Sequence, residues 1–166
     1  MNALYRTARR LTSRSGEAED LVQETFLEAF RGFSSLADPG RCRAWLFRIM
    51  RNRLFHQRER ARTRAGVELG GEGQGREAAG DLEREILDTG YSDEVERALR
   101  ALPEEFRTAV LLVAVEELSY DEVAEVMECP VGTVRSRVAR GRALLGAALV
   151  AATLPAAKAG RTKGIL

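Results

Sequence analysis

Apolar residues recur every three or four positions along most of this chain, which is the spacing of helices that bury one face. β-branched residues never alternate with polar ones over a long run, so the pattern predicts no strand. It predicts helices at about 3–12, 15–33 and 43–62, followed by a second group of helices between 92 and 147. The chain is therefore expected to be all-α.

The pattern also predicts which faces of the N-terminal helices are buried. The second helix is expected to bury a stripe of large side chains at helical spacing: Val22, Phe26, Phe30 and Phe33. The third is expected to bury a similar stripe: Leu46, Ile49, Met50 and Leu54. Together with the first helix, these two would form the core of a small three-helix unit.

A glycine-rich acidic segment separates the two groups of helices. Residues 66–80 hold six glycines and almost no large apolar side chains, so they cannot bury enough surface to fold alone. The chain is accordingly predicted to consist of two small helical domains, at 1–63 and 92–147. A flexible acidic linker, 64–91, would join them, and a tail, 148–166, would follow.

Charge is distributed unevenly along the chain, although the net charge is only +1. Residues 1–64 carry 14 arginines and 7 acidic residues, whereas residues 65–105 carry 4 arginines and 12 acidic residues. Residues 106–166 carry 8 basic and 6 acidic residues. Two basic ends around an acidic middle indicate two contacts with a polyanion.

The strongest local signature is a helix-turn-helix at 118–145. Ser119 and Glu122 form an S-x-x-E capping box, and Pro130 ends the first helix, so the turn is predicted at 128–130. Val134 and Val138 are expected to face inward. Polar and basic side chains are left on the outer face of the second helix: Thr133, Arg135, Ser136, Arg137 and Arg140. A basic helix of this size fits a DNA major groove, although a helical hairpin with a solvated charged face has the same spacing.

The third helix is a second candidate for nucleic-acid binding. Residues 41–62 contain eight arginines and one acidic residue. Four residues are expected to share one face of this helix: Trp45, Arg48, Asn52 and Phe55. Aromatic rings between cations and an amide suit single-stranded nucleic acid, by stacking, phosphate pairing and base-edge hydrogen bonds. Core packing of Trp45 and Phe55, and plain solvation of Arg48 and Asn52, remain the alternatives.

The second helix has an outer face on which one leucine lies among polar and charged residues. The members of this face are Asp20, Gln23, Glu24, Leu27 and Arg31. Such a face is typical of a protein-binding surface, and equally of a solvated surface with one stray apolar residue.

Several classes of function are not supported by the sequence. Cys42 and Cys129 lie 87 positions apart, with no C-x-x-C motif, which argues against zinc and against a disulfide scaffold. The one histidine, His56, has no carboxylate pair or nucleophile beside it, so neither an enzyme nor a cofactor is expected. The longest apolar run, 147–154, is too short to span a bilayer, and no signal peptide is visible. A cytoplasmic protein without membrane insertion is therefore expected.

In combination, these motifs resemble those of a bacterial sigma factor of the extracytoplasmic-function (ECF) group of the sigma-70 family. AEDLVQETFLEAF (18–30) resembles the polymerase-binding part of region 2. RAWLFRIMRNRL (43–54) resembles the part of region 2 that melts the promoter and reads its −10 element. LPEEFRTAVLL (102–112) and the helix-turn-helix resemble region 4, which reads the −35 element.

The resemblance implies partners and a role for each face. It implies a contact with core RNA polymerase through Asp20, Gln23, Glu24, Leu27 and Arg31. It implies a −10 strand contact through Trp45, Arg48, Asn52 and Phe55, with Asn52 where a flipped base is captured. It implies a −35 contact through Thr133, Arg135, Ser136, Arg137 and Arg140. The acidic linker would run toward the active-site cleft of the polymerase, and an anti-sigma factor would restrain the free protein.

Two other functions compete with this interpretation. A stand-alone helix-turn-helix regulator would explain residues 102–145 but not the basic, aromatic helix at 43–62, and an enzyme would explain neither. The sequence also departs from the family at Glu128, a turn position often held by glycine. A left-handed backbone at this glutamate would cost about 1 kcal/mol.

Overall fold

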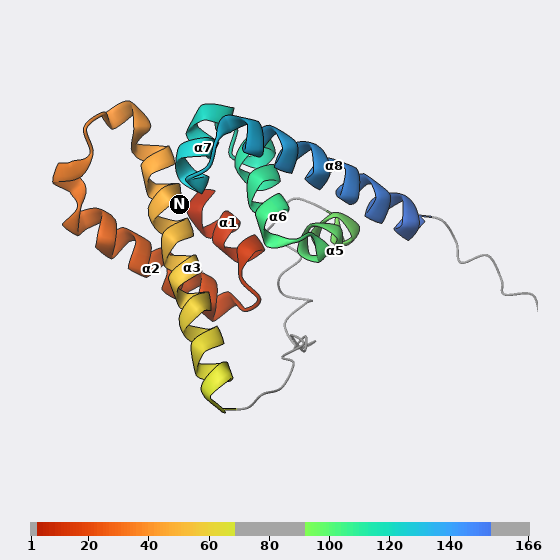
Figure 1. Ribbon diagram of the computed structural model, residues 1–166, viewed down its shortest axis with the longest axis horizontal. Helices are drawn as coiled ribbons and strands as arrows, with labels where there is room; N and C mark the ends of the chain where they lie inside the picture. The colour runs from red at the N-terminus through yellow and green to blue at the C-terminus, as the bar shows by residue number, and fades with distance from the viewer. Residues whose placement is uncertain (1–2, 69–91, 154–166) are drawn as a thin grey trace, which may run out of the picture.

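The structure, a computed structural model, describes residues 3–68 and 92–153. Every regular element within these ranges is helical, which confirms the all-α prediction (Figure 1). The expected flexibility of the acidic linker, and most of the predicted tail, lie outside the described residues. The described part corrects two boundaries: the third helix continues to Glu68, and the last helix continues to Thr153.

The N-terminal part consists of three helices, α1 (Ala3–Leu11), α2 (Ser15–Arg31) and α3 (Cys42–Glu68). Two short 3-10 turns, Phe33–Ser35 and Pro39–Arg41, join α2 to α3. Asp38 begins the second turn, where its Oδ1 accepts a hydrogen bond from the Gly40 N–H at 2.8 Å. The turns allow α2 and α3 to pack as a hairpin, with α1 against both (Figure 1).

The predicted inner face of α2 is wrong except at Val22, which is partly buried and packs against the core. Phe30 is 84% exposed, and Phe26 and Phe33 are also exposed. Small and medium side chains, one position away on the helix, are buried instead: Ala18, Leu21, Thr25 and Ala29. Thr25 is accommodated because its hydroxyl donates to the Leu21 carbonyl at 2.7 Å. Small side chains let α2 approach its neighbours closely, and the phenylalanines are left outside.

The core stripe of α3 was predicted in part. Met50 and Leu54 are buried as expected, but Phe47 is also buried, whereas Leu46 and Ile49 are only partly covered. Phe47 lies on the buried side because α3 is packed from two directions, by α2 and by α7 (Tyr120–Met127), a helix of the C-terminal part.

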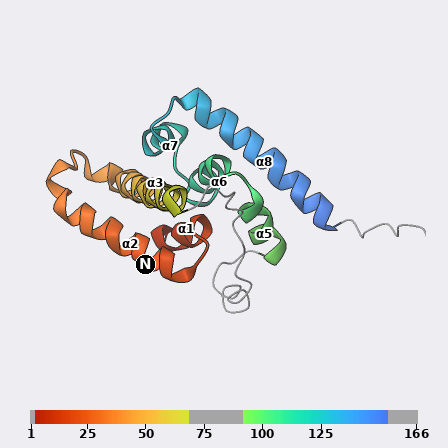
Figure 2. The same cartoon turned by 60° about the horizontal axis from the view of Figure 1, so that its bottom comes forward.

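The C-terminal part contains α5 (Asp93–Ala101), α6 (Glu104–Val110), a π-turn (Leu111–Val115), α7 and α8 (Val131–Thr153). The capping box at the start of α7 is confirmed, and Val134 and Val138 of α8 are buried as predicted. The two helices form the predicted helix-turn-helix. The last turns of α8 extend beyond α5 in both views (Figures 1 and 2).

The crossing of α6 and α8 depends on Gly141. A Cβ atom at this position would lie 2.6 Å from Val110 Cγ2 and 3.2 Å from the Phe106 carbonyl oxygen. Only glycine allows the two helices to approach this closely. The crossing thereby fixes the direction in which α8 leaves the domain.

The N- and C-terminal parts pack against each other through α1 and α3. The Arg10 guanidinium, which is buried, pairs with Glu96 at 3.0 Å. The Thr7 hydroxyl donates to the fully buried carboxylate of Glu116 at 2.7 Å. Because buried charges are stable only when they are paired, these contacts tie the two parts into one arrangement.

Two arginines cap the C-terminal end of α1. Arg58 of α3 donates to the Leu11 carbonyl at 2.5 Å, and Arg107 of α6 donates to the Arg10 carbonyl at 3.1 Å. Burial lowers the pKa of both guanidiniums, and the pKa of Arg58 is lowered further by the neighbouring charge of Arg107. Cations suit this site because the last carbonyls of a helix carry partial negative charge. One helix end thus holds side chains from both parts of the chain.

Candidate nucleic-acid interface

The predicted face of α3 is present, and its members differ in exposure. Arg48 is exposed, Trp45 and Asn52 are partly covered, and Phe55 is 48% exposed, so core packing does not explain Phe55. The Arg51 guanidinium lies 6.0 Å from the centre of the Phe55 ring, which is cation–π distance. Stacking and cationic groups are therefore presented along one side of α3.

A hollow of about 200 Å³ opens beside this face, between the turns after α2 and the start of α3. The turns and the start of α3 supply most of its lining, and α7 supplies one residue. The lining residues are Ser35, Leu36, Ala37, Asp38, Arg41, Ala44, Trp45, Arg48 and Glu125. Trp45 and Arg48, predicted to act together, are brought together here. The pattern of residues missed the loop side of the hollow, because Ser35, Leu36 and Ala37 carry no chemical signature of binding.

Three carboxylates of the C-terminal part lie over the basic side of α3 and the turn before it. Glu125 pairs with Arg41 at 2.5 Å, and the buried Glu116 pairs with Arg43 at 2.6 Å. The third is Glu128. Its carboxylate accepts from Asn52 Nδ2 at 3.1 Å and lies 3.4 Å from the Arg51 guanidinium.

Glu128 has a left-handed backbone, with φ 51° and ψ 47°, at the end of α7. The conformation suspected from the sequence is therefore the one adopted. This turn position brings the Glu128 carboxylate to Asn52.

The second candidate face is the outer side of α8 within the helix-turn-helix. Arg135, Ser136 and Arg140 are exposed, and Thr133 is partly covered. The side chain of Arg137 is only 24% exposed, because it pairs with Glu105 of α6 at 3.0 Å. Its guanidinium also lies 3.5 Å from Cys129 Sγ. Arg137 is thus held within the domain, whereas Arg135 and Arg140 are presented to solvent.

The outer face predicted on α2 is exposed along its length. Asp20, Gln23, Glu24, Leu27 and Arg31 are all accessible, and Leu27 is 51% exposed. The sequence reasoning missed the exposed phenylalanines, which extend this face with a large apolar strip: Phe26, Phe30 and Phe33. Phe26 and Phe30 belong to α2, and Phe33 begins the turn that follows it. Clustered large apolar side chains at a surface are typical of protein-binding sites.

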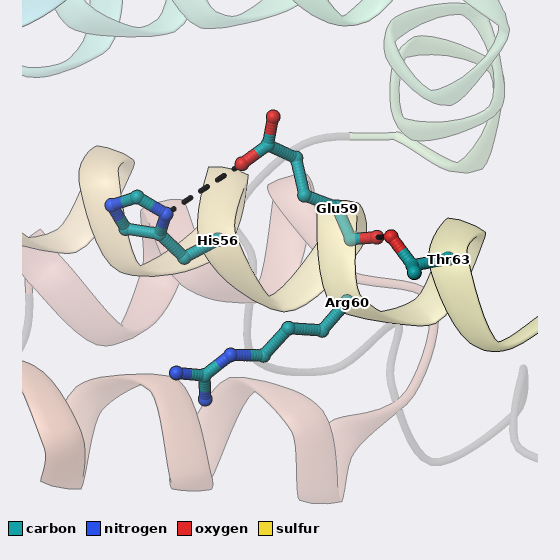
Figure 3. A pocket seen from close by; sticks show the side chains of 4 residues that line it. All are labelled: His56, Glu59, Arg60 and Thr63. Carbon is teal, nitrogen blue, oxygen red and sulfur yellow. Dashed lines mark hydrogen bonds and ion pairs between the residues drawn. The ribbon is translucent and has the colours of Figure 1, made fainter.

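The surroundings of His56 do not form a catalytic arrangement. A shallow hollow beside α3 is lined by His56, Glu59, Arg60 and Thr63, all from one helix (Figure 3). His56 Nδ1 lies 3.7 Å from Glu59 Oε2, and both side chains are mostly exposed. Arg60 leaves α3 on the opposite side from Glu59 in Figure 3, so the polar groups do not converge.

Residues 3–68 and 92–153 contain no group of three or more His, Cys, Asp or Glu side chains placed to hold a metal ion. None of the helices in this part of the chain combines the length and the apolar character needed to cross a membrane.

Two family models match the chain, one for each part. Sigma-70 region 2 matches residues 1–64, and Sigma-70 region 4 matches residues 92–145. The first covers α1, α2 and most of α3, and the second ends within α8.

Named relatives and solved structures agree with these matches. The ECF RNA polymerase sigma factor SigE of Mycolicibacterium smegmatis is 41% identical over 141 residues, which are 84% of this chain and 54% of that protein. The chain thus spans about half the length of that relative. The RNA polymerase sigma-H factor of Pseudomonas aeruginosa is 37% identical, over 76% of this chain and 69% of its own length. The ECF sigma-E factor of Escherichia coli is 36% identical, over 77% of this chain and 71% of its own length.

Among solved structures, the chain is similar to the sigma factor RpoE of Bartonella quintana in complex with the anti-sigma factor NepR. That similarity has a TM-score of 0.71 and 32% identity, and it covers 89% of this chain and 90% of RpoE. The structure of CnrH with the cytosolic domain of CnrY is similar with a TM-score of 0.63 and 31% identity, over 90% of this chain and 81% of the other.

Proposed function

The chain belongs to the ECF group of the sigma-70 family of RNA polymerase sigma factors, and we propose on that premise that it binds core RNA polymerase and directs promoter-specific initiation of transcription. Sigma factors are not enzymes. The observation that carries the proposal is the presence of both sigma-70 regions, in order, in one chain. A stand-alone helix-turn-helix regulator accounts for the second region and leaves the first without a role.

The proposed polymerase-binding surface is the outer face of α2. It combines the five polar and apolar residues predicted from the sequence with the exposed phenylalanines beside them, Phe26, Phe30 and Phe33. Burying a phenylalanine contributes about 1.5–3 kcal/mol, so this strip supplies most of the apolar driving force for binding. The carboxylates of Asp20 and Glu24 at its edge would orient the partner and exclude others.

The proposed −10 site is the exposed side of α3 with the adjoining hollow. Trp45 and Arg48 line the hollow, and Asn52 and Phe55 follow along the helix. An unstacked base would be held by an aromatic ring and an amide, and the arginines would pair with the strand's phosphates. Single-stranded DNA is the substrate that this combination fits.

The proposed −35 site is the outer face of α8 in the helix-turn-helix, which would lie in the major groove. Arg135, Ser136 and Arg140 are exposed there, and Thr133 is beside them. Arg137 would join them only after leaving its ion pair with Glu105. We further propose that the protein acts in the cytoplasm, where the polymerase is, and that an anti-sigma factor restrains it, as RpoE is bound by NepR.

The proposed function is tested with purified core polymerase. Leu27→Glu and Phe30→Ser should each weaken core binding at least tenfold, because a loss of about 1.4 kcal/mol changes affinity by that factor. Both side chains are exposed, so the thermal stability of the free protein should not fall. Binding is measured by fluorescence anisotropy and stability by circular dichroism.

Phe55→Ser is the matched control, since it removes an exposed phenylalanine from α3 and not from α2. It should bind core polymerase like the unmodified chain. Unchanged core binding by both α2 variants would refute the assignment of this surface. Absence of any binding by the unmodified chain would refute the proposed function itself.

A further inference from the structure

The arginines on the outer face of α8 differ in what they contact. Arg135 and Arg140 are exposed, whereas the side chain of Arg137 is only 24% exposed. Among the residues that the structure describes, the carboxylate of Glu105 lies 3.0 Å from the Arg137 guanidinium, and neither exposed arginine has such a partner. One cation of this face is therefore paired inside its own domain.

Arg137 lies at the edge of the outer face and not at its centre. Val134, three positions before it, and Val138, directly after it, are buried, whereas Ser136, directly before it, is exposed. At 3.6 residues per turn, this places Arg137 on a flank of α8. A helix in the major groove presents its outermost side to the base edges, and its flanks lie nearer the phosphates of the groove walls. The expected DNA partner of Arg137 is therefore a phosphate.

Glu105 is brought to this flank by the packing of α6. It belongs to the first turn of α6, which crosses α8 at Gly141, and its side chain is 51% exposed. The other terminal nitrogen of Arg137 lies 3.5 Å from Cys129 Sγ. Carboxylates and phosphates are the same kind of partner for arginine, because both are anions whose oxygens accept its N–H groups. Glu105 and a DNA phosphate therefore compete for one guanidinium.

We propose that Glu105 sets the DNA affinity of the −35 site by competing with the DNA backbone for Arg137. Arg137 is paired with Glu105 in the free protein and exchanges this partner for a phosphate when duplex DNA binds. The inference rests on the proposed function, because it assigns the outer face of α8 to duplex DNA. Glu105 then acts on DNA binding through Arg137, as a positioning residue.

An ion pair of this exposure is weak enough to exchange. Exposed pairs typically change an equilibrium constant by a factor of about five or less, and salt weakens them. A phosphate contact gains in addition from the counterions that it releases from DNA, which a pair within the protein does not. At low salt the exchange toward DNA is therefore favourable, and the Glu105 carboxylate reduces the gain.

The test compares the unmodified full chain with Glu105→Gln, with Arg137→Ala and with the double variant. Glutamine keeps the size of the side chain and removes its charge. The matched control is Glu104→Gln, at the neighbouring position in the first turn of α6. Glu104 is 43% exposed and pairs with Arg58 of α3, so the control removes the same charge and a comparable ion pair without freeing Arg137.

Two properties are measured for each variant. Anisotropy of a short fluorescein-labelled duplex of mixed sequence gives the DNA affinity at several salt concentrations, and circular dichroism gives Tm. Relative to the control, Glu105→Gln should bind about two- to fivefold more tightly at low salt, with no increase in Tm. Arg137→Ala should bind more weakly and reduce the magnitude of the salt slope by about 0.9. With alanine at position 137, Glu105→Gln should affect binding no more than Glu104→Gln does.

An affinity of Glu105→Gln equal to or below that of the control would overturn the inference. So would a gain that persists in full without Arg137, because the carboxylate would then act by general repulsion of DNA. A merely structural ion pair would lower Tm and DNA affinity together, whereas the proposal requires affinity to rise while Tm does not.

Failure of the inference and failure of the proposed function give different results. Duplex binding without coupling between Glu105 and Arg137 would overturn the inference alone and leave the −35 site in place. Absence of duplex binding by the unmodified chain at low salt would count against the −35 site itself and would overturn the inference with it.

Discussion

Replacing Gly141 by alanine tests whether the close crossing of α6 and α8 holds region 4 together. The added Cβ would lie 2.6 Å from Val110 Cγ2 and 3.2 Å from the Phe106 carbonyl oxygen. Val110 is buried and β-branched, so its methyl group has little freedom to turn away. The Phe106 oxygen belongs to the backbone of α6. The clash is therefore relieved only if the two helices separate.

The magnitude follows from two opposing terms. Overpacking a core contact costs about 1–3 kcal/mol, whereas glycine to alanine within a helix gains about 1 kcal/mol. The added Cβ would meet a stiff side chain and a backbone oxygen, so the overpacking cost is expected near the upper end of its range. The free energy of unfolding should therefore fall by about 1–2 kcal/mol. That corresponds to a decrease in Tm of roughly 3–8 °C for a unit of this size.

The same helix provides the control. A Cβ at Gly146 would meet nothing within 4 Å, and this residue is exposed. Gly146→Ala should therefore raise Tm, because only the helix-propensity gain remains. Tm is measured by far-ultraviolet circular dichroism, which reports helix content, and −35 duplex binding by anisotropy. If Gly141→Ala were as stable as Gly146→Ala, the reasoning about the crossing would be refuted.

Four further outcomes are expected. Ser119→Ala should cost about 1 kcal/mol, through loss of the N-cap of α7. Hydrogen bonds from the Ser119 backbone and hydroxyl lower the pKa of Glu122 below its usual 4.5, so this glutamate stabilises the fold above that pH. The contribution is lost as pH falls through the lowered pKa, and Glu122→Gln should therefore flatten the acid side of a plot of Tm against pH. Arg137→Ala should lower Tm as well as −35 affinity, because Arg137 pairs with Glu105, whereas Arg135→Ala should lower only the affinity. Asn52→Ala should leave binding to duplex promoter intact but impair opening in permanganate footprinting, and normal opening would remove Asn52 from the site.

The helix-turn-helix was predictable because its determinants are local. The capping box joins residues three apart, and Pro130 ends the first helix by its own covalent geometry. The buried positions Val134 and Val138 follow from spacing on one helix. Every one of these signals lies within a few residues of the structure that it specifies.

The buried face of α2 was not predictable from spacing alone. Two stripes with the same period run along this helix, one of small and medium residues that includes Thr25 and one that includes Phe26 and Phe30. Hydrophobicity favours the phenylalanines, but the close approach of α1 and α3 favours the smaller side chains. Tertiary packing therefore decides which stripe is buried, and the phenylalanines stay exposed, as they would on the proposed protein-binding surface.

The packing of the N-terminal helices against the C-terminal helices also could not be predicted from the sequence pattern. The hydrogen bond from Thr7 to Glu116 joins residues 109 positions apart, and no local motif marks either residue. The sequence indicated a basic α3, but it gave no reason to place Glu125 and Glu128 on it.

The continuity of α8 has a mechanical consequence. One continuous helix, α8, carries both the outer face of the helix-turn-helix and the C-terminal segment. It crosses α6 at Gly141. At 1.5 Å per residue, the arm from Gly141 to Thr153 is about 18 Å and the arm back to Thr133 about 12 Å. If α8 tilted as a rigid rod about this crossing, a displacement at its C-terminal end would move Thr133 in the opposite direction by about two-thirds as much. Force applied at the C-terminal end of this helix would then change the orientation of the proposed −35 face.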